Sequence, residues 1–124
     1  MILKKLSLAV LALLAASLLA PSADAHPTLK AASPAAESVT VNEPSEIKLT
    51  FSEGVISKFS KVELKDQGGK TIATGKVATN PKDQKELVVA LQAPLKAGTY
   101  IVTWNIVSVD THRVHGTYSF KVGG

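Results

Sequence analysis

Residues 98–122 read GTYIVTWNIVSVDTHRVHGTYSFKV, and the pattern of this stretch indicates how the chain folds. Large apolar side chains occupy every second position in its first half: Tyr100, Val102, Trp104 and Ile106. Tyr118, Phe120 and Val122 repeat the pattern in its second half. A period of two is typical of a β-strand with one buried face. We therefore expect strands over 98–109 and 116–122, joined by a polar connection.

The same alternation continues through the rest of the chain after residue 25, and no helical period interrupts it. It predicts five further strands, near 38–41, 46–52, 60–66, 70–78 and 86–92. Turn-forming residues, among them Gly68-Gly69 and Asn80-Pro81, separate them. Short strands at this spacing predict an all-β fold, a seven-stranded Greek-key sandwich or barrel of immunoglobulin or cupredoxin type.

The first 25 residues have the features of a secretory signal peptide. Lys4 and Lys5 precede an apolar run over residues 6–20, and Ala23-Asp24-Ala25 is a cleavage site of A-x-A type. The run is short for a membrane span, which needs about 20 apolar residues, although an uncleaved anchor is the alternative. We expect a signal peptide over 1–25 and one exported domain over 26–124.

Charge and cysteine content narrow the possible functions of that domain. Without Lys4, Lys5 and Asp24, the 14 basic and 10 acidic side chains become 12 and 9, a net charge of +3. The basic residues are scattered, so a nucleic-acid surface is not indicated. The chain has no cysteine, which excludes disulfides and thiolate metal ligands.

Asp110 and His112 follow the apolar strand directly. If the strand parity continues past Ile106, both side chains project from the same face, with their Cα atoms about 6–7 Å apart. Two such residues can meet at one metal ion. On these residues alone, the pattern favours a turn at Asp110 with histidines exposed to solvent.

His26 strengthens the metal interpretation, because cleavage after Ala25 places it at a new N-terminus. Its amine and imidazole can then chelate one cation. Together with Asp110 and His112 they form a set of nitrogen and oxygen donors that suits Cu(II) in tetragonal geometry. Pro27 has no N–H, so the next backbone nitrogen cannot become a ligand and the remaining donors must come from elsewhere in the fold.

These stretches resemble the periplasmic copper-binding proteins of the CopC type. The likeness rests on the start at His26, on LTFSE at 49–53 and on residues 98–122, which follow the family pattern G-x-Y-x-V-x-W-x-V-x-S-x-D-G-H-x-x-x-G-x-x-x-F-x-V. The resemblance implies a β-sandwich that binds Cu(II) through His26, Asp110 and His112. It implies that Glu53 lies beside the site without binding the metal.

The sequence departs from the family in two respects. Its one methionine is Met1, so the methionine-rich Cu(I) site of some members is not expected. Thr111 stands where the family has glycine, which restricts the backbone if that position needs a positive φ. His115 occupies a variable position of the pattern, and we expect it to be exposed on the surface.

Three functions follow as hypotheses from different classes. The leading one is a periplasmic protein that buffers or delivers Cu(II) and catalyses no reaction. A copper monooxygenase is the alternative, since such enzymes also hold copper with an N-terminal histidine. An immunoglobulin-like accessory module is the third. The resemblance further implies a CopD-like inner-membrane partner for copper transport.

Overall fold

The computed structural model describes residues 26–123, and the predicted signal peptide, residues 1–25, lies outside them. Within this range the chain forms strands and one short 3-10 helix, η1 (Ser57–Phe59). The strands are β1 (Leu29–Ser33), β2 (Val39–Thr40), β3 (Glu46–Phe51), β4 (Lys61–Asp66), β5 (Thr71–Ile72), β6 (Thr74–Asn80), β7 (Asp83–Leu91), β8 (Gly98–Val107) and β9 (Arg113–Val122). No stretch of residues 26–123 forms an apolar helix of membrane-spanning length.

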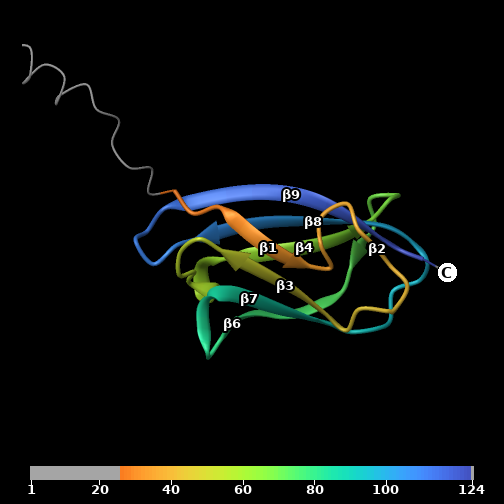
Figure 1. Ribbon diagram of the computed structural model, residues 1–124, viewed down its shortest axis with the longest axis horizontal. Coiled ribbons are helices and arrows are strands. Elements are labelled where there is room, and N and C mark those ends of the chain that lie inside the picture. Colours follow the sequence, from red (N-terminus) through yellow and green to blue (C-terminus); the bar gives the residue numbers. More distant parts are fainter. Residues whose placement is uncertain (1–25, 124) are drawn as a thin grey trace, which may run out of the picture.

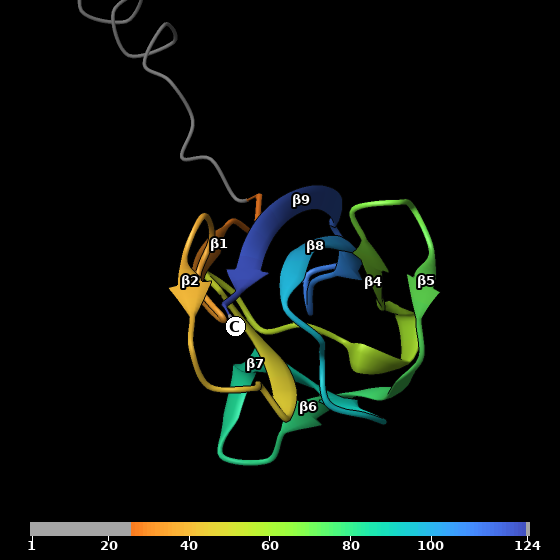
Figure 2. The ribbon, with the colours of Figure 1, turned by 90° about the vertical axis from the view of Figure 1, so that its right-hand side faces the viewer.

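The strands assemble into two sheets (Figure 1). One sheet has the order β1-β3-β7-β6 and the other β2-β9-β8-β4-β5. The view along the long axis shows both sheets curving around a shared interior (Figure 2). All neighbouring strands are antiparallel except β2 and β9, which run parallel. The predicted all-β sandwich is confirmed.

The core forms from the alternating side chains that the sequence identifies. Ile47, Leu49 and Phe51 of β3 are at most 1% exposed, while the polar residues between them are half-buried. On β8, Tyr100, Val102 and Ile106 are buried, and the Tyr100 ring stacks on Phe120 with centroids 5.7 Å apart. Burial of such side chains stabilises the fold by about 1.5–3 kcal/mol each, so a domain without disulfides can rest on this core.

The strand count differs from the prediction, because the described residues contain nine strands where the alternation predicts seven. β1 reads LKAAS, and its alanines give neither a clear alternation nor a strong β-propensity. It is a strand because it pairs with the edge of β3. The predicted strand over 70–78 is two strands: β5 pairs with β4 in one sheet, and β6 pairs with β7 in the other.

Gly116 of β9 lies opposite Trp104 of β8, and the indole packs directly over it. A Cβ atom at residue 116 would lie 2.2 Å from Trp104 Cζ2, well inside van der Waals contact. We expect Gly116→Ala to lower the free energy of unfolding by about 1–3 kcal/mol through overpacking, measured by chemical denaturation. Gly75→Ala is the control, because its new Cβ would meet Ala90 at an ordinary 3.6 Å. Equal stability of the two variants would contradict this packing.

Candidate metal centre

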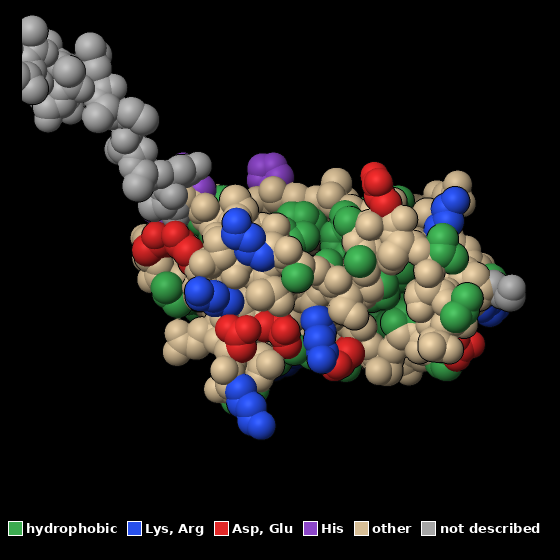
Figure 3. Space-filling model, in the orientation of Figure 1, with side chains coloured by type: hydrophobic (Ala, Val, Ile, Leu, Met, Phe, Trp, Pro, Cys, Tyr) green, Lys and Arg blue, Asp and Glu red, His purple; other side chains and the backbone are tan. Residues whose placement is uncertain are grey.

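Three segments that are distant in sequence meet at one end of the sandwich. They are the start of the described chain, the loop that follows β3, and the connection from β8 to β9, all at the left in Figure 1. Histidine and acidic side chains are visible on the surface at this end (Figure 3). The candidate residues His26, Glu53, Asp110 and His112 come from these segments.

The β8–β9 connection is a tight loop, residues 108–112. Val107 and Arg113 are the last paired residues of the ladder, so the chain leaves the strand earlier than the expected residue 109. The Ser108 N–H donates to the carbonyl of His112 at 2.9 Å, and the Thr111 N–H donates to the carbonyl of Ser108 at 2.9 Å. Asp110 and His112 are therefore presented by a turn and not by a continued strand.

This turn nevertheless brings the Asp110 and His112 side chains together. His112 Nδ1 lies 3.1 Å from Asp110 Oδ2, and each side chain is about two-fifths exposed. The hydroxyl of Ser108 donates to Asp110 Oδ1 and, together with His112, holds the pKa of the Asp110 carboxyl below its usual value. The carboxylate therefore stays anionic at neutral pH, as a metal ligand must be.

The Nδ1 atom of His112 is buried and takes part in no hydrogen bond. Asp110 Oδ2 lies 3.1 Å from it at ion-pair distance, and this contact helps to lower the pKa of the Asp110 carboxyl. Buried polar atoms are rarely left without a hydrogen bond, and a water molecule or a bound ion can supply the missing partner. A metal ion shared with Asp110 would satisfy this nitrogen.

His26 lies beside this pair. Its ring is 5.0 Å from the His112 ring between centroids, in an edge-to-face arrangement. Two hydrogen bonds hold the backbone two residues further along: the Ser52 N–H donates to the Thr28 carbonyl at 2.8 Å, and the Thr28 N–H donates to Ser52 Oγ at 2.9 Å. In the full chain the backbone nitrogen of His26 belongs to a peptide bond. His26 therefore offers its imidazole to a metal but no α-amine.

Glu53 occupies the loop that links both halves of the site. Ser52, on one side of it, holds the segment that begins at His26. Gly54, on the other side, accepts a hydrogen bond at 2.9 Å from the N–H of Val109, the residue before Asp110. This backbone position is consistent with a carboxylate close to the site, as the family resemblance implies.

His115 lies on β9 and pairs with Asn105, beyond the loop that carries His112. Its side chain is exposed, on the outward-facing parity of the strand. The expectation of a surface histidine is confirmed. Sequence reasoning assigned no role to Ser108, which is fully buried and contacts Asp110. Its one sequence signal is a polar side chain at an inward-facing position of the strand pattern.

The candidate ligand side chains lie near one another, but their donor atoms do not converge on a common metal position. Among residues 26–123, no three side chains of His, Cys, Asp or Glu converge closely enough to hold a metal ion by themselves. The imidazole of His112 nevertheless lies next to both the imidazole of His26 and the carboxylate of Asp110. This nitrogen and oxygen chemistry, with the unsatisfied Nδ1 atom, fits Cu(II), and an α-amine at His26 would complete a set of four donors.

Thr111 adopts a left-handed conformation with φ of +70°. The glycine that the family carries at this position would tolerate it, whereas a β-branched residue is strained there by roughly 1–2 kcal/mol. We expect Thr111→Gly to raise the free energy of unfolding by about 1 kcal/mol, because this relief exceeds the entropy lost with glycine, roughly 0.5–1 kcal/mol. Thermal denaturation measures the gain. Thr111→Ala keeps the strained φ, and equal stabilisation by alanine would refute the backbone explanation.

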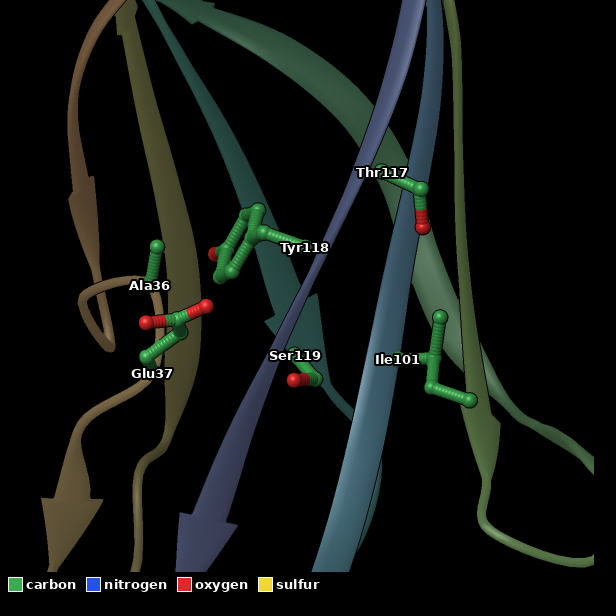
Figure 4. A pocket seen from close by; sticks show the side chains of 6 residues that line it. All are labelled: Ala36, Glu37, Ile101, Thr117, Tyr118 and Ser119. Atoms are coloured by element: carbon green, nitrogen blue, oxygen red, sulfur yellow. The ribbon is translucent and has the colours of Figure 1, made fainter.

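A surface hollow lies on the β8–β9 ladder, away from the 108–112 loop (Figure 4). It is lined by Ala36, Glu37, Ile101, Thr117, Tyr118 and Ser119. Burial raises the pKa of Tyr118 to about 12, so its phenol stays neutral. Glu37 and Tyr118 are the only ionisable residues in this lining. The hollow therefore offers fewer metal donors than the end of the sandwich that carries the histidines.

Comparison with known proteins identifies the family to which this fold belongs. The profile of a family described as the CopC domain matches residues 29–123. Protein YobA of Escherichia coli K12 is 43% identical over 112 residues, covering 90% of each chain. Copper resistance protein C of Escherichia coli is 43% identical over 108 residues, covering 82% of this chain and 84% of the relative.

A solved structure shows the same architecture. The crystal structure of PcoC, a methionine-rich copper resistance protein from Escherichia coli, superposes with a TM-score of 0.71 and 41% sequence identity. The match covers 79% of this chain and 99% of PcoC. The likeness thus extends over essentially all of that domain.

Proposed function

The chain belongs to the CopC domain family, and on that premise we propose that it is a periplasmic protein that binds one Cu(II) ion for copper homeostasis, resistance or delivery. A copper-related function follows from the family and from its relatives named copper resistance protein C. The oxidation state, the ligands and the compartment are the parts that we propose.

One observation carries the proposal: the juxtaposition of Asp110 and His112 with His26 at the end of the sandwich. The buried Nδ1 atom of His112 has no hydrogen bond and lies 3.1 Å from Asp110 Oδ2, which is a spacing at which two ligands can share a metal ion. The His26 ring lies next to them, 5.0 Å from that of His112. We assign the ligands as the imidazoles of His26 and His112, the carboxylate of Asp110 and the amine of His26.

The amine becomes available when the signal peptide, residues 1–25, is removed. Before cleavage the nitrogen of His26 is an amide and has no lone pair to offer a metal. Cleavage therefore acts as the maturation step of the site, and the exported domain over 26–124 is the copper-binding form. Glu53 lies beside the site and supports it without binding the metal.

The donor set supports Cu(II) over Cu(I). Cu(I) prefers soft sulfur ligands. This sequence has no cysteine and no methionine after Met1, whereas PcoC is described as methionine-rich. The Asp110 carboxylate would occupy a coordination position that a copper oxygenase leaves open for oxygen, so we assign storage or delivery and no catalysis.

The partner and the compartment follow from the same proposal. A protein exported by a cleavable signal peptide and loaded with Cu(II) would work in the periplasm. There it would exchange copper with an inner-membrane transport protein of the CopD type.

Metal titration of the processed protein tests this function. The protein is purified after export, and its mass shows whether the chain starts at His26. We expect it to bind Cu(II) with one-to-one stoichiometry in competition with a chelator, and to bind Cu(I) much more weakly. Binding of Cu(I) in preference to Cu(II), or failure to bind either ion, would contradict the proposal.

A further inference from the structure

Ser108 is the one polar residue among the fully buried side chains of the described chain. It directly follows Val107, the last residue of β8, and its backbone forms an isolated bridge with Val55 of the loop after β3. This position places a buried hydroxyl group at the start of the loop that carries Asp110 and His112. A buried hydroxyl needs hydrogen-bond partners, and all its partners lie in this loop.

The hydroxyl group contacts both residues. It donates to Asp110 Oδ1, and the carbonyl of His112 is a second acceptor within reach at 3.3 Å. It also accepts a hydrogen bond from the backbone N–H of His112 at 3.2 Å. Ser108 thus connects the carboxylate of one proposed ligand to the backbone of the other.

The two oxygens of Asp110 are divided between two partners as a result. Oδ1 faces Ser108, and Oδ2 lies 3.1 Å from His112 Nδ1. A carboxylate that accepts a hydrogen bond from a buried donor on one oxygen presents only the other oxygen freely to a metal.

We propose that Ser108 is a positioning residue of the copper site: its hydroxyl holds the Asp110 carboxylate so that this ligand binds through Oδ2 alone. The inference rests on the function proposed above. Without the hydroxyl, the carboxylate can rotate and use either or both oxygens. Removing a group that hydrogen-bonds to a metal ligand typically weakens metal affinity by about 10–100-fold.

Ser108→Ala in the processed protein tests the proposal, with Ser60→Ala as a matched control. Ser60 also lies near the end of β8, and its hydroxyl donates to the Ile56 carbonyl at 2.7 Å and accepts from the Val107 N–H at 3.1 Å. It therefore reports the loss of a structural hydroxyl. We expect Ser108→Ala to weaken Cu(II) binding about 10–100-fold and to change the electron paramagnetic resonance (EPR) spectrum of the bound ion. Ser60→Ala should lower stability and leave both copper properties unchanged.

A double-mutant cycle with Asp110→Ala separates positioning from general damage. If Ser108 acts through the carboxylate, then adding Ser108→Ala to Asp110→Ala changes the Cu(II) affinity by no more than about twofold. A full 10–100-fold loss in that background would overturn the proposal, as would an unchanged affinity and spectrum in Ser108→Ala alone. If the proposed function itself is wrong, the result differs from both of these, because the unmodified protein would then not bind Cu(II).

Discussion

One alanine inserted between Ala25 and His26 will weaken Cu(II) binding by at least about a hundredfold, equivalent to about 2.7 kcal/mol. After cleavage the free amine belongs to the added alanine, and the nitrogen of His26 is a peptide amide again. The five-atom path from amine to imidazole that allows chelation is lost. Pro27 moves to the third position, where its fixed ring hinders rearrangement of the backbone around the metal.

Competition with a chelator of known affinity measures this loss, and mass spectrometry shows where each chain starts. A variant with one alanine added after Gly124 is the control, because it lengthens the chain equally and leaves the proposed site intact. Equal affinity of the N-terminally extended and unmodified proteins would show that the amine is not a ligand.

His112→Ala will also weaken Cu(II) binding at least about a hundredfold, because it removes the imidazole whose buried Nδ1 faces Asp110. His115→Ala is its matched control. His115 lies three residues further along the chain and is exposed on β9, so its removal should change the affinity by no more than about twofold. Both affinities are measured by the same chelator competition.

Loss of folding is excluded by comparing the circular dichroism of the two histidine variants. The EPR spectrum provides a second measure, since His112→Ala should lose one nitrogen coupling and His115→Ala none. Equal losses of affinity in the two variants would refute the assignment of His112 as a ligand.

Most of the fold was predictable from period-two alternation. In β3 the pattern of Ile47, Leu49 and Phe51 is unbroken, because one face of the strand lies against the core. β1 was not predictable in this way, since its alanines carry little preference and its strand conformation depends on β3. The split of residues 70–78 into β5 and β6 was also not predictable. Local alternation does not show that the chain passes from one sheet to the other near Ala73.

At the site, the sequence correctly predicted that Asp110 and His112 lie together, but the physical reason for their contact is different. Parity along an extended strand suggested that Asp110 and His112 share a face, whereas the structure brings them together through a turn with Thr111 at φ +70°. The concern that Thr111 occupies a position suited to glycine is confirmed.

Contacts between distant segments were beyond the reach of the sequence patterns. The two hydrogen bonds between Thr28 and Ser52 hold the segment after His26 at the end of β3, and they join residues 24 positions apart. The role of Ser108 likewise depends on its burial at the start of the loop, where its backbone pairs with Val55 of the segment after β3.

The EPR spectrum of the processed protein with one equivalent of Cu(II) tests the central claim most directly, because it reports the donor atoms and the geometry together. The proposed ligands predict a tetragonal site with three nitrogen donors, from the amine and two imidazoles, and one oxygen donor from Asp110. A spectrum with oxygen donors only, or one identical to that of the variant extended by an alanine before His26, would contradict the proposed site.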